Sequence, residues 1–336
     1  MDTIYAAVGI DVSKKKLDVA LLVDGKIKAK VVENCAKGHQ TLIDWLGKSK
    51  VPLSALHVCM EATGVYSEPA ALALHQAGLL VSVVNPACIK GFGHSENIRN
   101  KNDGIDAGLI ARYCRAMKPP AWNPPPLEQR QLRAWSMRVQ ALKDIRQQEE
   151  NRLEALSISQ MDEVAQHVKQ HIAWLNAEID KLESDVNDHI DRHPGLKHDA
   201  DLLVSIPGVG VATVAKILGH LGDIRRFESA KAFAAFLGVT PRQRTSGSSL
   251  KGRTVISRSG STAMRAALYM PSLVARRHNP ILHQFAQRLA ATGMAKKAVI
   301  GAVMHKLAHL IYGVIHNGKS FDPNYLMKGL ATQDGI

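Results

Sequence analysis

Five prolines lie within eight residues, and they divide the chain at positions 119, 120, 124, 125 and 126. Proline fixes φ and lacks a backbone N–H, so such a segment continues neither a helix nor a central strand. The chain has 336 residues, of which 46% are hydrophobic, and this is enough for two or three globular domains at roughly 100–200 residues each. We therefore expect one folding unit before the prolines and a differently built region after them.

The segment before the prolines has the pattern of an α/β domain. Apolar runs predict strands at 6–10, 16–22, 28–32, 55–60 and 79–84. The Asp24-Gly25 pair supplies a hairpin turn between the second and third runs. Helical spacing follows the third and fourth runs, at 38–46 and 68–77. A meander followed by alternating helices and strands predicts a mixed sheet with helices on its faces.

After the prolines the pattern becomes helical. Two long helices are predicted, at 127–156 and 161–193. In the second, apolar residues recur at steps of three and four, a spacing close to a heptad seam: Val164, Val168, Ile172, Leu175, Ile179, Leu182 and Val186. This predicts an antiparallel hairpin or a coiled coil between subunits. The remaining segment reads as mostly helical, so the expected domains are 1–126, 127–197 and 198–328.

The charge distribution indicates a polyanionic partner. The formal net charge is +13, and no Asp or Glu occurs between Glu228 and Asp322, where fourteen Lys or Arg residues lie. A globular segment that excludes carboxylates in this way is expected to face nucleic acid; the alternative is a basic domain without a specific partner. The four cysteines have no zinc-ligand spacing and fit reduced thiols, and we expect a soluble cytoplasmic protein without a membrane span.

Four carboxylates are candidate metal ligands. Asp11 and Glu61 each end a predicted strand, and Asp103 and Asp106 are spaced i,i+3, which places them on one helix face. Together they offer the hard oxygen ligands that one or two Mg²⁺ ions require. The alternative for each residue alone is a turn or helix-capping role. Two neighbouring cations are candidates for holding phosphate: Arg99 and Lys101.

A second candidate contact with nucleic acid is the segment 205–210, Ser-Ile-Pro-Gly-Val-Gly, between two predicted helices. It resembles the hairpin of helix-hairpin-helix modules, in which backbone N–H groups hold DNA phosphates at a helix N-terminus. Gly208 and Gly210 are the candidate residues. The alternative is an ordinary Pro-Gly helix junction.

A serine cluster follows at 246–249, in a glycine-rich stretch with four flanking cations: Arg242, Arg244, Lys251 and Arg253. Such cations could stabilise the charge that develops when a serine attacks a phosphate. The alternative is a mobile Gly/Ser loop that only binds backbone phosphates. Three histidine pairs at i,i+4 read as packing or surface residues rather than metal sites: His167/His171, His189/His193 and His305/His309.

Taken in order, these motifs resemble the DEDD insertion-sequence transposases of the IS-one-ten family. The resemblance rests on segments 9–14, 61–64, 100–107, 206–210, 236–241, 246–249 and 269–271. It implies an N-terminal domain like the RuvC Holliday-junction resolvase, with an RNase H-type fold. It also implies that Asp11, Glu61, Asp103 and Asp106 bind metal and that Ser246 joins DNA covalently.

The resemblance further implies the partners. These are double-stranded donor and target DNA, a structured noncoding RNA encoded by the element, and other copies of the chain in a dimer or tetramer, with the two halves of one active site supplied by different subunits. The expected location is the bacterial cytoplasm, at the nucleoid.

Three other functions remain open from the residues alone. A RuvC-like nuclease would hydrolyse DNA junctions with water and two metals, and Ser246 would be dispensable. A binding scaffold without chemistry is disfavoured, because unneutralised carboxylates repel phosphate unless a metal bridges them. A sugar-kinase relative shares the opening Gly9-Ile10-Asp11 but would need glycine-rich phosphate loops, and the basic C-terminal segment would have no purpose in it.

Overall fold

The structure is a computed structural model that describes residues 6–96, 103–242, 245–246, 250–251, 255–257 and 259–324. For residues 103–105, 245, 246, 250 and 251 only the backbone is described. The chain forms two compact units, Met1–Pro124 and Pro125–Ile336. The boundary falls inside the proline-rich segment, where the sequence predicts a break.

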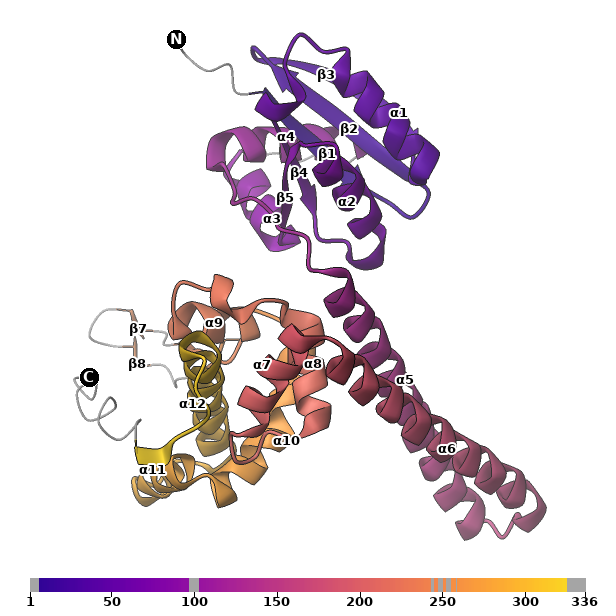
Figure 1. Ribbon diagram of the computed structural model, residues 1–336, viewed down its shortest axis with the longest axis vertical. Coiled ribbons are helices and arrows are strands. Elements are labelled where there is room, and N and C mark those ends of the chain that lie inside the picture. The colour runs from indigo at the N-terminus through magenta and orange to yellow at the C-terminus, as the bar shows by residue number, and fades with distance from the viewer. Residues whose placement is uncertain are drawn as a thin grey trace. The chain divides into compact units, whose positions relative to one another are not determined.

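The first unit contains a five-stranded mixed sheet in the order β3-β2-β1-β4-β5 (Figure 1). Its strands are β1 (Ala6–Val12), β2 (Lys16–Val23), β3 (Lys26–Glu33), β4 (Leu56–Glu61) and β5 (Leu80–Val84). The first three strands form an antiparallel meander, and β4 and β5 run parallel to β1 and to each other. At the tip of the second hairpin, Asp24 and Gly25 both have positive φ, as the predicted two-residue turn requires.

Helices cover both faces of this sheet. On one face, α1 (Ala36–Gly47) and α2 (Glu68–Gln76) bury Leu42 and Leu74 against alternate residues of β1 and β4. On the other face lie α3 (Pro86–Ser95) and α4 (Asp103–Met117), which bury Ile89 and Ile110 against Ala7 and Cys59. Two short 3-10 helices, η1 (Leu53–Ala55) and η2 (Gly64–Tyr66), connect the elements. The predicted mixed sheet with helices on its faces is therefore confirmed.

The proline-rich segment is anchored to β5. The hydroxyl of Ser82 lies 3.1 Å from the carbonyl of Pro119 and 2.8 Å from that of Pro120. His57 contacts the same hydroxyl at 2.7 Å, and the Trp122 N–H donates to Val81 at 2.7 Å. Burial lowers the pKa of His57, which favours the neutral form of its ring. These hydrogen bonds hold residues 119–122 against β5 of the first unit.

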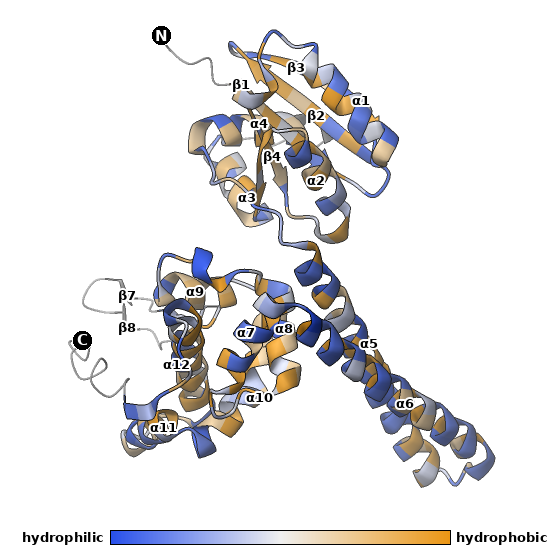
Figure 2. Cartoon of the chain, in the orientation of Figure 1, coloured by the Kyte–Doolittle hydropathy of each residue, from blue (hydrophilic) through white to orange (hydrophobic). Residues whose placement is uncertain are grey.

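The second unit begins with the predicted helical hairpin of α5 (Leu127–Ile158) and α6 (Asp162–Arg192), which pack along each other in Figure 1. The C-terminal part of the predicted seam packs within the chain. Its residues are buried in the same cluster as Leu142 of α5: Leu175, Ile179, Leu182 and Val186. Outer surfaces of the hairpin are hydrophilic (Figure 2). A coiled coil between subunits stays a prediction.

Among the described residues of this unit, six further helices follow: α7 (Pro194–Val204), α8 (Val211–Leu221), α9 (Ala230–Leu237), α10 (Thr262–His278), α11 (Pro280–Ala291) and α12 (Lys296–Asn317). A 3-10 turn, η3 (Ile224–Arg226), joins α8 to α9. One hydrophobic cluster extends from Leu132 in α5 to Ile315 in α12. Within the described residues, α12 alone is long and apolar enough to span a membrane, but most of its apolar window is buried in this cluster.

Candidate active site

Two of the predicted acidic residues, Asp11 and Glu61, share the face of the sheet that α4 covers. Side chains alternate along a strand, and Val8, Ile10 and Met60 point toward α1 and α2. Asp11 and Glu61 therefore point to the opposite face. Because β1 and β4 are parallel with Ile10 opposite Met60, Asp11 and Glu61 end neighbouring strands at the same edge of the sheet. Both are half-buried.

Helix α4 approaches this face unusually closely. A Cβ added at Gly9 would lie 2.2 Å from the Ala107 carbonyl oxygen and 2.3 Å from the Ala111 nitrogen, so only glycine allows this contact. Ala107 and Ala111 are buried against Ala20 of β2. The half-buried Asp106 directly precedes Ala107, and the packing at Gly9 therefore fixes the height of Asp106 above the sheet.

The remaining predicted residues of this region are only partly described. Asp103 is the first residue of α4, so it shares the helix with Asp106 at the predicted i,i+3 spacing, but its side chain lies outside the described residues. Arg99 and Lys101 also lie outside them. Among the side chains that the structure does describe, no three His, Cys, Asp or Glu residues form a group able to hold a metal ion.

Asp18 is an acidic residue of this face that the sequence analysis missed. It lies opposite Asp11 in the antiparallel register of β1 and β2. Asp18 is only 8% exposed, and its carboxylate forms an ion pair with the Lys16 ammonium group at 3.1 Å. The signal in the sequence is an acidic residue inside the apolar run of β2, where alternation places it on the same face as Ala20. Lys16 therefore neutralises the carboxylate of Asp18 beside the acidic strand end.

Asn34 connects the two loops that follow the acidic strand ends. Its side-chain amide donates to the Ser13 carbonyl at 2.9 Å and to the Tyr66 carbonyl at 3.0 Å. His39 contacts the Asn34 side-chain oxygen at 2.8 Å. His39 is buried, and burial lowers its pKa, which favours a neutral ring. This contact network holds the loops after β1 and β4 together, and the sequence pattern gave no indication of it.

The predicted serine nucleophile lies on a β-hairpin rather than in an irregular loop. The base of the hairpin pairs β6 (Pro241–Arg242) with β9 (Val255–Ile256), and its outer part pairs β7 (Thr245–Ser246) with β8 (Leu250–Lys251). Ser246 lies opposite Leu250. Of the flanking cations, Arg242 is exposed and Lys251 is described by its backbone alone. Arg244, Arg253, Ser248 and Ser249 lie outside the described residues.

Two glycines close the base of this hairpin. Gly238 ends α9 with φ of +70°, and Gly260 has φ of +141°. A Cβ at Gly260 would lie 2.5 Å from the Gly238 nitrogen. The Ser257 N–H also donates to the Thr240 carbonyl at 2.7 Å. The two ends of the hairpin are therefore fixed to the helical body of the second unit.

The predicted phosphate-binding hairpin at 205–210 does join two helices, α7 and α8. Its two glycines have different surroundings. Gly208 has φ of +104°, and a Cβ there would lie 2.6 Å from the Ala275 nitrogen of α10, so packing alone requires glycine. Gly210 is exposed, caps α8 without a side-chain hydrogen bond, and has open space around it. Gly210 is thus the accessible residue of the pair.

Comparison with known proteins agrees with these features. Residues 200–287 match the family described as Transposase IS116/IS110/IS902, and residues 8–157 match a DEDD-type transposase family of IS110 elements, described as Transposase. A pilin gene-inverting protein of Moraxella bovis is 34% identical over 319 residues, which are 94% of this chain and 97% of that protein. A transposase for insertion sequence element IS1328 of Yersinia enterocolitica is 26% identical and covers 74% of this chain and 80% of its own length.

Among solved structures, T. thermophilus RuvC in complex with Holliday junction substrate is similar to 35% of this chain and 99% of its own, with 16% identity and a TM-score of 0.26. The two family matches fall on the parts of the chain that carry the carboxylates and the serine hairpin, and the Moraxella relative aligns along almost the full length. The resemblance seen in the sequence motifs is therefore confirmed: this chain belongs to the IS110 family and is a DNA transposase.

Proposed function

We propose that this transposase cleaves and exchanges DNA strands through a covalent bond between Ser246 and DNA, with a divalent metal held by Asp11, Glu61, Asp103 and Asp106. The observation that carries the proposal is the arrangement of the first unit. Asp11 and Glu61 end neighbouring parallel strands, and α4, which bears Asp103 and Asp106, packs against the same face.

The donor set fits a hard divalent cation, because all four candidate ligands are carboxylates. Mg²⁺ is the proposed ion. When bound, it would supply Lewis-acid activation of the scissile phosphate. We propose an RNase H-type fold for this unit, supported by the strand order β3-β2-β1-β4-β5.

The serine step balances without an external energy source. The Ser246 hydroxyl oxygen attacks the scissile phosphorus, the bond from phosphorus to the leaving sugar oxygen breaks, and the serine proton passes to a base or to water. The product is a serine phosphodiester and a free sugar hydroxyl. A second sugar hydroxyl can reverse the step on another strand, which reseals DNA without ATP. Arg242, Arg244, Lys251 and Arg253 are proposed to stabilise the developing charge.

The partners proposed for the enzyme are donor and target double-stranded DNA, a structured noncoding RNA encoded by the element, and further copies of the chain. The carboxylates and Ser246 lie in different compact units, which is compatible with supply of the two sets by different subunits of a dimer or tetramer. Domain boundaries of 1–126, 127–197 and 198–328, and a cytoplasmic location at the nucleoid, are part of the same proposal.

A second candidate activity is inversion of a DNA segment between two sites. It is favoured by the full-length similarity to a protein named for inverting a pilin gene. Inversion and transposition use the same cleavage and resealing chemistry and differ in which ends are joined. A plasmid with two copies of the element end in inverted orientation separates them, because inversion flips the intervening segment whereas transposition moves it to a new site.

The experiment that tests the proposal is a recombination assay with purified protein, the element DNA and its flanking transcript. Wild-type protein with Mg²⁺ should recombine the ends, and EDTA should stop the reaction until Mg²⁺ is restored. Asp11→Asn and Ser246→Ala should each be inactive while their thermal unfolding matches the wild type. Full activity of Ser246→Ala would favour the hydrolytic alternative, and full activity in metal-free buffer would refute the metal site.

A further inference from the structure

Two loops at the acidic edge of the sheet present side chains that the proposed metal site does not use. The turn after β1 contains Lys14 and Lys15, and the turn after β4 contains Val65 and Tyr66. These four residues form the edge-loop surface. Both turns begin at the strand ends that carry candidate metal ligands, so whatever occupies this surface lies beside the candidate active site.

Hydrogen bonds hold the two loops next to each other. A single side-chain nitrogen of Asn34 donates to the Ser13 carbonyl at 2.9 Å and to the Tyr66 carbonyl at 3.0 Å. The backbone N–H of Asn34 donates to the Lys15 carbonyl at 2.9 Å. The backbone beneath the edge-loop surface is therefore anchored from both sides, and the lysines and the aromatic ring belong to one surface.

The loop after β4 exposes two large side chains on this anchored backbone. Val65 is 69% exposed and Tyr66 is 41% exposed. None of the ring contacts between described residues involves Tyr66. Single exposed apolar residues are common on proteins, but two adjacent ones beside a candidate active site offer a contact for a flat ring.

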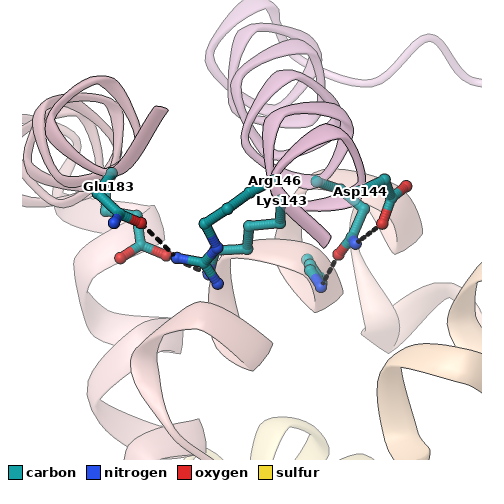
Figure 3. A network of polar contacts seen from close by, with 7 residues as sticks. Lys143, Asp144, Arg146 and Glu183 are labelled. Atoms are coloured by element: carbon teal, nitrogen blue, oxygen red, sulfur yellow. Dashed lines mark hydrogen bonds and ion pairs between the residues drawn. The ribbon is translucent and has the colours of Figure 1, made fainter. Parts of the chain in front are cut away.

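The loop after β1 adds positive charge. Lys14 and Lys15 are exposed, and no ion pair between described side chains involves either of them. Lys143 of α5 shows the contrast, because it pairs with Glu183 at 2.5 Å (Figure 3). The exposed Glu33 ends β3 at the same edge of the sheet, and the two lysines outnumber it.

An aromatic ring beside ammonium groups matches the chemistry of a nucleic-acid strand. Bases stack on aromatic side chains with little regard to sequence, and lysines contact the phosphates between them. A base inside a duplex is already stacked on both sides, so Tyr66 meets only a base that has left the stack. Because the carboxylates at this edge are proposed to hold metal at the cleaved phosphate, that base lies next to the cleavage position.

We propose that the edge-loop surface binds an unstacked nucleotide of the DNA strand beside the scissile phosphate, with its base against Tyr66 and Val65 and its phosphates at Lys14 and Lys15. This inference rests on the proposed function, because it names the form of DNA that the acidic site accepts. The substrate is then DNA that opens next to the cleavage position rather than an intact duplex.

The first test maps the contact directly. Element-end DNA with iododeoxyuridine next to the mapped cleavage position is bound to full-length Ser246→Ala protein and irradiated, and the attached peptides are identified by mass spectrometry. Attachment within 62–67 supports the proposal. Cross-links confined to other segments overturn it, as does attachment within 62–67 from iodouridine-labelled RNA alone. Cleavage by Ser246→Ala would refute the serine chemistry of the proposed function without altering where the DNA attaches.

The second test removes the ring. Tyr66→Ala should slow cleavage of fully paired element-end DNA about five- to 150-fold, the range expected for one lost stacking contact, whereas Tyr66→Phe should stay close to the wild type. Leu80→Ala is the matched control, because Leu80 is 38% exposed and begins β5 at the opposite edge of the same sheet. Equal cleavage by Tyr66→Ala and the wild type would overturn the proposal.

A mismatched base pair beside the cleavage position separates this role from a structural one. A mismatch lowers the cost of unstacking, so it should restore much of the rate that Tyr66→Ala loses and change the wild-type rate less. A defect of the same size on paired and mismatched DNA would show that Tyr66 does not hold an unstacked base.

The last test concerns the phosphates. The double variant Lys14→Gln, Lys15→Gln should weaken DNA binding and reduce the slope of log affinity against log salt by about two, as expected for two lost phosphate contacts. Lys48→Gln with Lys50→Gln is the control of equal charge, at exposed positions between α1 and β4, and should keep the wild-type slope. Equal slopes for the two double variants would overturn the phosphate contact. Failure of the wild type to bind any DNA would overturn both the surface and the proposed function.

Discussion

At the scale of single residues, Gly9 decides how closely α4 can approach the acidic edge of the sheet. A Cβ at this position would lie within 2.3 Å of the α4 backbone at two points. Gly9→Ala should therefore push α4 away from β1, destabilise the protein by about 1–3 kcal/mol, and reduce recombination further than the stability loss explains, because Asp106 moves relative to Asp11.

Thermal unfolding and recombination assays on the purified variant check this expectation. Gly91→Ala is the matched control, since Gly91 lies in α3 with no atom within 4 Å of an added Cβ and alanine favours the helix. Wild-type activity of Gly9→Ala at full stability would show that the spacing between α4 and β1 does not position the site.

His309 makes the stability of the second unit depend on pH. Its Nε2 atom is buried without a hydrogen-bond partner, and burial, together with the charges of His305, Lys306 and Lys231, lowers its pKa from 6.5 to about 4. In the unfolded chain His309 therefore becomes protonated below about pH 6.5. In the folded protein it becomes protonated only near pH 4. Stability is complete above that window and is lost as the pH falls through it.

Urea unfolding of the wild type at about pH 7 and about pH 5 should show lower stability at the acidic value. The difference should shrink in His309→Leu, which removes the titrating ring. His167→Leu, at an exposed position of α6, should keep the wild-type difference. An unchanged pH dependence in His309→Leu would mean that other groups control acid sensitivity.

At the scale of elements, the helical hairpin of α5 and α6 combines a packed proximal part with an exposed distal part. Leu175 is buried against α5, whereas Val164 and Trp174 are each 53% exposed. Leu175→Ala should destabilise the protein by about 2–5 kcal/mol, because it leaves a cavity in the core. Val164→Asp should leave stability unchanged and weaken self-association if the distal part contacts another subunit.

Light scattering with nucleic acid present, alongside thermal unfolding, separates the two effects. A wild type that stays monomeric at every concentration would contradict the proposed oligomer. Equal self-association of Val164→Asp and wild type would place the subunit contact elsewhere.

Most elements could be predicted from the sequence because their signals are local. The apolar runs of β1 and β2, the Asp24-Gly25 turn and the proline boundary depend on a few neighbouring residues, and each is present where expected. Within the site, the placement of Asp11 and Glu61 at strand ends followed from the same local patterns.

Features that depend on distant partners could not be predicted in this way. Asp18 lies opposite Asp11 because of the register between β1 and β2. Asn34 links the loops after β1 and β4, which are far apart in the sequence and come together only in the folded chain. Gly208 matched a phosphate-binding motif, yet its immediate surroundings are the backbone of α10. The serine segment could be a mobile loop by composition, but pairing of residues 241–242 with 255–256 makes it a hairpin.

At the scale of the whole molecule, the charge distribution predicts strong salt dependence. The net charge is +13, and fourteen Lys or Arg residues lie in the acid-free segment between Glu228 and Asp322. If about six to ten phosphates are neutralised, DNA affinity should fall by about 10³–10⁵ between about 50 and 200 mM salt. Titrations at several salt concentrations check this expectation, and a flat response would remove the electrostatic argument for a polyanionic partner.

The most direct measurement of the central claim is to identify the residue that becomes attached to DNA. The wild-type protein is incubated with Mg²⁺ and an element end carrying a nick, so that the cleaved strand dissociates and cannot be resealed. The denatured protein–DNA adduct is then digested and sequenced by mass spectrometry. The account predicts a phosphodiester on Ser246, no adduct with Ser246→Ala or with EDTA, and continued adduct formation with Ser248→Ala and Ser249→Ala. Attachment at Ser248, Ser249 or a tyrosine, or cleavage without any adduct, would contradict it.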